Sequence, residues 1–256
     1  MPTRRDEAFV LTRYPFRERD LVVVLLTRGS GQARMVARRA RTLRSSQATA
    51  MEPLALIRVE YFERPGAELA TLHEASVVRS GFPLAADPPA WAAGQVVAEL
   101  ALLYCPPGQR AEAAFRLVDR CLVCLLDGHE PESVAWYAEF WFLKLAGVFP
   151  ELDRCGVCGV DLPDGPRVFD PAEKHFTCQE HRPARSAVRI GAAGTSWLQR
   201  ASRLPLEQVT EPAPGDAGGW LVTLREQFTE RQVQSWRYLR HLLDKRDSGP
   251  GPRGSH

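Results

Sequence analysis

The stretch Leu21-Val-Val-Val-Leu-Leu-Thr-Arg-Gly-Ser-Gly-Gln-Ala-Arg-Met-Val-Ala-Arg38 decides how the N-terminal part of this chain folds. Two runs rich in apolar and β-branched residues flank Arg28-Gly-Ser-Gly31, and a turn signal between such runs predicts two antiparallel strands. Three more runs of this type cover residues 7–14, 51–62 and 69–78. Five short strands in about 80 residues predict a small closed barrel of the OB-fold type, which binds nucleic acid strands across one face. Periodicity alone also permits an SH3-like barrel.

The rest of the chain has helical periodicity. Apolar residues recur at helical spacing over residues 90–104, 110–126, 130–148, 195–204 and 220–243, and the last helix should pack back onto the first three. We therefore expect a multidomain β + α protein, with an OB-fold barrel at residues 1–81 and a helical bundle formed by residues 82–150 and 184–246. Residues 151–183 should form a zinc-binding insert in that bundle. Residues 247–256 end in Arg-Gly-Ser-His256, which is typical of a tag remnant, and we expect a disordered tail there.

The composition is that of a globular protein. The chain has 256 residues, of which 45% are hydrophobic and 25% charged. No window approaches the roughly 18 consecutive apolar residues of a membrane-spanning helix, and the N-terminus lacks an apolar signal core. The six cysteines are too dispersed for a small disulfide scaffold. We expect a cytoplasmic protein with reduced thiols and no membrane partner.

Two short cysteine-containing turns carry the clearest chemical signal. The first is Cys155-Gly-Val-Cys158, and the second, after nineteen residues, is Cys178-Gln-Glu-His181. Each turn offers two ligands on one side, which is the spacing of tetrahedral structural zinc sites. Because four protein ligands leave no coordination position for water, we expect a closed, structural zinc site. His175 is a rival fourth ligand.

Arginines are concentrated in the predicted barrel. Residues 1–81 contain fourteen arginines and nine acidic residues, about +5 in all, although the whole chain carries only +2. No acidic residue occurs between Leu21 and Met51, and the predicted DNA-binding residues lie in that stretch: Arg34, Arg38, Arg39, Arg41 and Arg44. Guanidinium groups bind phosphate oxygens bidentately and release counterions, so the pattern indicates a nucleic acid partner. Four aromatic residues are candidates for stacking on bases, although half of them must lie in the core: Tyr14, Phe16, Tyr61 and Phe62.

Signatures of enzymes are missing from the sequence. There is no Walker A, HExxH or G-x-S-x-G motif, and no histidine is followed two residues later by the glutamate of a zinc deaminase. The pair Cys121-Leu-Val-Cys124 has ligand-like spacing but lies in an apolar helical run, which favours two core thiols. We therefore expect a protein without catalytic activity.

Several segments, taken in their order along the chain, resemble the RecO family of DNA repair and recombination mediators. The matching pieces are Ala8-Phe-Val-Leu-Thr-Arg13, Tyr14-Pro-Phe-Arg-Glu-Arg-Asp20, Leu25-Leu-Thr-Arg-Gly-Ser-Gly31, Arg38-Arg-Ala-Arg41, Leu69-Ala-Thr-Leu-His-Glu-Ala75 and the run from Phe140 through Phe149-Pro-Glu-Leu-Asp-Arg-Cys155 to Gly159. The last piece is the most specific. One departure is Val36-Ala37, where family members often have Lys-Gly before the basic block.

The resemblance covers about residues 7–245 and implies an N-terminal OB-fold, a helical C-terminal domain and, in many members, an inserted zinc motif. It further implies binding of single- and double-stranded DNA, annealing of complementary strands, and help in loading recombinase onto strands coated by single-strand-binding protein (SSB). RecR and the C-terminal tail of SSB are the implied protein partners, and the implied location is the nucleoid. Two readings from the residues alone remain open: an RNA-binding factor, and a non-catalytic protein-interaction module with a structural zinc site.

Overall fold

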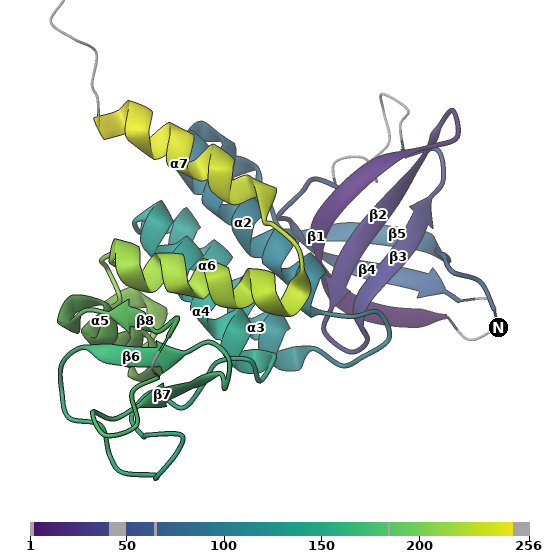
Figure 1. The fold of residues 1–256 in the computed structure, drawn as a ribbon. Helices are drawn as coiled ribbons and strands as arrows, with labels where there is room; N and C mark the ends of the chain where they lie inside the picture. The colour runs from purple at the N-terminus through teal and green to yellow at the C-terminus, as the bar shows by residue number, and fades with distance from the viewer. Residues whose placement is uncertain (1–2, 41–49, 64–65, 184, 248–256) are drawn as a thin grey trace, which may run out of the picture. The chain divides into compact units, whose positions relative to one another are not determined.

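The structure, a computed structural model, describes residues 3–40, 50–63, 66–183 and 185–247. The chain forms two compact units, one drawn from residues 1–132 and 233–256 and the other from residues 133–232. In the described residues, the first unit contains a β-barrel and helices, and the second contains helices and a small sheet (Figure 1).

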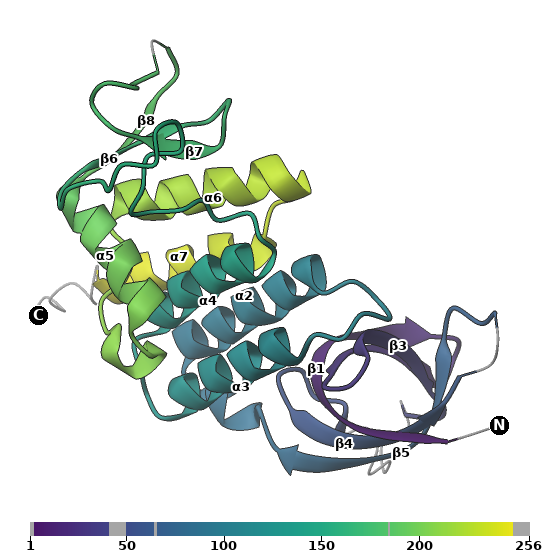
Figure 2. The same ribbon diagram turned by 90° about the horizontal axis from the view of Figure 1, so that it is seen from below.

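The N-terminal barrel confirms the predicted five-stranded OB-type architecture. Its strands are β1 (Arg4–Phe16), β2 (Asp20–Thr27), β3 (Gly31–Ala37), β4 (Leu56–Phe62) and β5 (Ala70–Arg79). The strand order is β1-β2-β3-β5-β4, and β1 pairs back onto β4 to close the barrel. Figure 2 looks into this ring of strands. All neighbouring strands are antiparallel except β3 and β5, which pair in parallel.

Alternation along each strand separates the barrel core from its surface. On β3, Met35 and Ala37 point into the barrel core and are fully buried, whereas Arg34, the residue before Met35, is exposed. This is the period-2 pattern on which the strand prediction depended. The predicted fourth strand was too long at its start, because residues 51–55 form turns. Leu54 has a φ of 67°, and pairing begins only at Leu56.

The helices of the first unit follow the barrel and return after the second unit. A 3-10 turn, η1 (Phe82–Ala86), leads into α2 (Pro88–Tyr104) and α3 (Glu112–Leu126), and α7 (Gln234–Asp247) packs against α2. Helix α2 is buried on most of its surface because it contacts α3, α7 and β1. The carboxylate of Glu99 on α2 accepts the N–H groups of Gln234 and Ser235 at 2.8 and 2.9 Å, which satisfies donors in the first turn of α7.

The second unit combines helices with a three-stranded sheet. Helix α4 (Pro131–Leu145) is followed by β6 (Arg167–Asp170), β7 (His175–Thr177), β8 (Val188–Ile190), α5 (Ala192–Arg203), the 3-10 turn η2 (Leu206–Gln208) and α6 (Gly215–Thr229). The sheet order is β7-β6-β8. The ring of Trp220 on α6 lies 5.3 Å from the rings of both Phe169 and Phe176, so the sheet and α6 share an aromatic core.

The prediction of one continuous helix over residues 220–243 was wrong. The chain leaves α6 at Glu230, whose φ of 54° is left-handed, and restarts as α7 at Gln234. The helical spacing of apolar residues continues on both sides of the break, and no glycine or proline marks it. Consequently α6 belongs to the second unit and α7 to the first.

No helix in the described part of the chain is long and apolar enough to cross a membrane. The predicted disordered tail lies, except for Asp247, outside the described residues.

Candidate nucleic-acid interface and metal centre

One end of the barrel carries two basic turns, one directly before β2 and one directly after β3. The first turn, residues 17–19, joins β1 to β2 and exposes Arg17 and Arg19. The second turn, residues 38–40, follows β3 and exposes Arg38 and Arg39. They lie at the same end because Leu21, next to the first turn, pairs with Ala37, next to the second. Strand 2, strand 3 and the loop between strands 1 and 2 are the surface with which OB-folds bind oligonucleotides.

The structure thus adds two arginines to the basic residues that the sequence singled out. Arg17 and Arg19 belong to the β1–β2 turn, whereas the predicted cluster begins at Arg34, fifteen positions after Arg19 in the sequence. The signal that would have found them is strand pairing: in a meander, the start of β2 and the end of β3 lie together. Arg41 and Arg44 of the predicted cluster lie outside the described residues.

The strand faces next to these turns carry further exposed side chains. Val24 on β2 pairs with Arg34 on β3, and Val22 pairs with both Tyr14 on β1 and Val36. Directly paired residues share a face of the sheet, so Arg34 and Tyr14 lie on the same outer face. Both are exposed.

The four aromatic candidates divide between core and surface. Tyr61 is 1% exposed in the barrel core, whereas Tyr14 is 42% exposed. Phe16 is half-buried, and the guanidinium of Arg17 lies 5.2 Å from its ring centre. Phe62 is half-buried on the far side of the barrel, on β4. Tyr14 is therefore the side chain of the four that is best placed to stack on a base beside the basic turns.

Ion pairing distinguishes this end of the barrel from the rest of it. Among the described residues of the five barrel strands, six arginines each lie within ion-pair distance of a carboxylate: Arg4, Arg5, Arg13, Arg28, Arg58 and Arg79, counting Arg28 at the end of β2. Within the described residues, Arg19, Arg34 and Arg38 form no such pair. An arginine without a carboxylate partner keeps its full charge for an external anion.

The two cysteine-containing turns meet in the second unit. The ligand atoms of Cys155, Cys158, Cys178 and His181 all lie within 4.8 Å of one another. Sγ of Cys178 is 4.0 Å from Sγ of Cys158 and 3.2 Å from Nδ1 of His181. With Zn–S bonds of about 2.3 Å, a tetrahedral ion separates two sulfurs by about 3.8 Å, so the spacing fits a metal ion.

Backbone hydrogen bonds shape the first of these turns. The N–H of Cys155 donates to the carbonyl of Val160 at 2.9 Å, and that of Gly159 donates to the carbonyl of Cys155 at 2.8 Å. Gly159 has a φ of 72°, a left-handed conformation that glycine adopts without strain. These two hydrogen bonds close the turn around Cys155.

Neighbouring groups move the thiol pKa values in opposite directions. Burial raises the pKa of Cys155, but backbone hydrogen bonds, the first from Cys158, outweigh it and hold this pKa below its usual value. The pKa of Cys178 is likewise lowered, since backbone hydrogen bonds from His181 and Glu180 exceed the effect of burial. The pKa of Cys158 is raised: a backbone hydrogen bond from Val160 lowers it, but burial and the neighbouring thiols prevail. Two sites in the cluster therefore favour the thiolate that metal binding requires.

His175, the rival fourth ligand, is used differently. Its ring lies against Gly156, so closely that a Cβ atom at this glycine would collide with it. The group of side chains that converges in the structure contains His181 and not His175. His175 therefore packs on the first turn instead of completing the ligand set.

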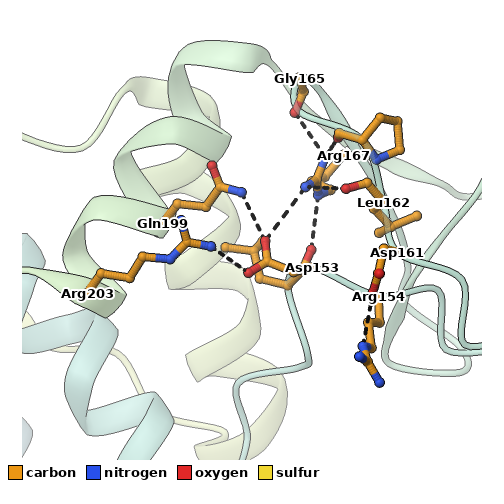
Figure 3. A network of polar contacts seen from close by, with 10 residues as sticks. Asp153, Arg154, Asp161, Leu162, Gly165, Arg167, Gln199 and Arg203 are labelled. Carbon is orange, nitrogen blue, oxygen red and sulfur yellow. Dashed lines mark hydrogen bonds and ion pairs between the residues drawn. The ribbon is translucent and has the colours of Figure 1, made fainter.

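A polar network holds the base of the metal-binding element (Figure 3). Arg167 on β6 is almost fully buried, and its guanidinium donates to the carbonyls of Leu152 at 3.0 Å, Pro163 at 2.6 Å and Gly165 at 3.2 Å. Asp153, 3.8 Å from Arg167, accepts hydrogen bonds from Gln199 and Arg203 on α5, each at 2.9 Å. The insert is thus attached to α5 by contacts that do not involve the metal ligands.

Two charged members of this network, Asp153 and Arg167, have shifted pKa values. The hydrogen bond from Gln199 is the main cause that lowers the pKa of Asp153, with a further contribution from Arg203. Burial lowers the pKa of Arg167, although the nearby Asp153 and Asp164 partly offset it.

The two buried cysteines of α3 are not members of the Cys/His cluster found among the described residues. Cys121 and Cys124 are 0% and 1% exposed in the first unit, as the apolar helical run predicts.

Comparisons with known proteins agree with this arrangement. Residues 1–81 match the family model described as "Recombination protein O N terminal", and residues 85–237 match "Recombination protein O C terminal". Over 250 residues the chain is 32% identical to the DNA repair protein RecO of Koribacter versatilis, covering 95% of this chain and 99% of that protein. It is also 32% identical to the same protein of Anaeromyxobacter sp. strain K, over 90% and 93% of the two chains. To that of Moorella thermoacetica it is 27% identical, over 96% and 93%.

Proposed function

The chain belongs to the RecO family of DNA repair proteins, and from this premise we propose that it is a non-catalytic recombination mediator that binds DNA through the basic end of its barrel. The observation that supports this most directly is the position of Arg19, Arg34 and Arg38. These arginines are exposed and lack an ion-paired carboxylate among the described residues, on the surface where OB-folds hold oligonucleotides.

The proposed binding mode does not depend on sequence. Arginines on turns and on an outer strand face contact phosphates, and Tyr14 stacks on a base regardless of its identity. Single and double strands both present phosphates, so both are ligands. Annealing then needs no bond chemistry, since the arginines screen the repulsion between two strands and hold them at high local concentration.

In this proposal RecR and the C-terminal tail of SSB are the protein partners, and the protein assists the loading of recombinase onto SSB-coated strands. Both partners are proposed from family membership.

The metal centre has a structural role in this proposal, and the metal is zinc. Three thiols and one imidazole form the soft, four-ligand set that zinc prefers in closed structural sites. Bound zinc links the two ligand turns covalently, and in isolated zinc fingers such binding supplies folding free energy on the order of 10 kcal/mol. Because Arg167 and Asp153 hold the base of the insert separately, zinc stabilises mainly the two ligand turns.

Fluorescence anisotropy of a labelled single-stranded oligonucleotide, titrated at several salt concentrations, tests the DNA-binding proposal. The variant is Arg34→Ala/Arg38→Ala, and the matched control is Arg5→Ala/Arg58→Ala, which removes two arginines that already have carboxylate partners. We expect the first variant to bind more weakly and its salt slope to fall by about 1 to 2, at roughly 0.7 per lost phosphate contact. The control should change far less. Equal losses in both variants, or no binding by the wild type, would reject the proposal.

A further inference from the structure

An acidic residue lies between the two basic turns. Asp20 is the first residue of β2 and directly follows the turn at residues 17–19. Its carboxylate Oδ1 accepts the backbone N–H of Arg39 at 2.9 Å. A single side chain next to the first turn thus accepts a hydrogen bond from the backbone of the second.

The second turn is also held from inside the barrel. Ala37 and Ala40, which flank the exposed Arg38 and Arg39, are 0% and 1% exposed in the barrel core. Arg39 has a φ of 54°, a left-handed conformation that is unfavourable for a residue with a side chain. The N–H that Asp20 accepts is that of this left-handed residue, in a turn that exposes both Arg38 and Arg39.

We propose that Asp20 is a positioning residue for DNA binding, which fixes the turn at residues 38–40 beside the turn at residues 17–19 so that both bind one phosphate backbone. This inference rests on the proposed function. Removal of the Asp20 carboxylate should change DNA affinity in the direction opposite to the one that simple electrostatics predicts. A carboxylate near a phosphate site repels the ligand, so its removal should tighten binding if charge alone mattered. If Asp20 holds the turn, its removal weakens binding.

Four variants of the full chain separate the two effects. Asp20→Ala removes the charge and the acceptor, Asp20→Asn removes the charge but keeps an acceptor oxygen, and Asp20→Glu keeps the charge but displaces the carboxylate by one methylene. Glu18→Ala is the matched control, because this exposed residue of the first turn carries the same charge. Anisotropy with an oligothymidine at several salt concentrations measures affinity and salt slope, and a urea titration of each variant checks folding.

We expect Asp20→Ala to bind about fivefold more weakly with a reduced salt slope, as the loss of a charge-assisted hydrogen bond predicts. Asp20→Glu should also weaken binding, while Asp20→Asn should bind at least as tightly as the wild type and Glu18→Ala about twofold more tightly. If Asp20→Ala fails to fold, the other two variants still test the inference, because Asp20→Glu should weaken DNA binding and Asp20→Asn should not. The inference alone is overturned if the wild type binds and Asp20→Ala tightens binding, or if Asp20→Asn is as weak as Asp20→Ala. Absence of wild-type binding overturns the proposed function with it.

Discussion

The ring of Phe115 on α3 lies 4.9 Å from the ring of Phe9 on β1, with the two planes inclined by 46°. Phe9 points out of the barrel, since its neighbours Ala8 and Val10 fill the barrel core, yet both rings are 0% exposed. The guanidinium of Arg28 lies 4.8 Å from the centre of the Phe115 ring, and Arg79 donates to Asp119 on α3 at 2.5 Å. The barrel and α3 therefore share a small core, rimmed by arginines, inside the first unit.

Truncation of Phe115 should destabilise the first unit. The change Phe115→Ala removes a fully buried ring, and losses of about 3 to 5 kcal/mol in the free energy of unfolding are typical of such changes. Urea titration followed by circular dichroism measures the loss. Phe82→Ala is the control, because Phe82 is 71% exposed and its removal should cost less than about 0.5 kcal/mol. Similar effects of the two changes would contradict the shared core.

The metal content of two variants shows whether His181 or His175 is the fourth metal ligand of the insert. His181→Ala removes one of the four converging ligands, so zinc should be lost to a competing chelator at concentrations that leave the wild type loaded. His175→Ala keeps all four ligands and should retain about one zinc ion per chain. Metal content after graded chelator exposure, determined by mass spectrometry, distinguishes the variants. Zinc loss from His175→Ala with retention in His181→Ala would reverse the assignment.

The buried ion pair of the second unit should be sensitive to the loss of one partner. Arg225 lies 2.7 Å from Glu139, and both side chains are at most 2% exposed. Glu139→Gln removes the buried carboxylate at 2.7 Å and leaves the buried guanidinium only the partly exposed Glu226, and the loss of a buried charge partner costs about 3 to 5 kcal/mol. Glu226→Gln is the matched control: Glu226 pairs with the same arginine at 3.6 Å but is 41% exposed. Its loss should cost about 1 kcal/mol or less in the same denaturant titration.

Stability at alkaline pH should depend on Cys105. Burial raises the pKa of Cys105 from 9.0 to about 11. The raised pKa means that the folded chain keeps its proton where the unfolded chain loses it. The contribution of this thiol to stability is therefore complete below about pH 9 and is lost progressively up to about pH 11.

In Cys105→Ala the free energy of unfolding should fall less steeply over this window than in the wild type. Urea titrations at pH 7, 9 and 10.5 would show it, and the pH 7 measurement controls for the packing lost with the side chain. Parallel curves for the two proteins would show that the thiol does not titrate as the structure indicates.

Local patterns were enough for much of this molecule. The alternation in residues 21–38 located β2 and β3, and the two C-x-x-[CH] turns supplied all four side chains that converge in the second unit. In both cases the information lies within a few residues of the feature itself. The alternation of apolar residues along a strand shows which of its faces is buried, and the number of residues between two ligands shows that a turn can bind a metal.

Other features depend on contacts between distant segments. The helix break at Glu230 has no glycine or proline signal. The strand β4 begins later than predicted because residues 51–55 form turns, and the N–H of Leu54 donates to the carbonyl of Val10 on β1 at 2.8 Å. Arg167 looks like an ordinary surface arginine in the sequence, yet it is 2% exposed and binds backbone carbonyls of the insert.

The sequence by itself determined that the chain has a basic five-stranded barrel, a helical remainder and a four-ligand metal motif. Only the tertiary structure decided that Arg17 and Arg19 join Arg38 and Arg39 at one end of the barrel, with Asp20 between them. The physical reason is that periodicity reports the faces of one strand at a time. Which turns become neighbours is set by strand pairing across the closed barrel, a contact between segments about twenty residues apart in the chain.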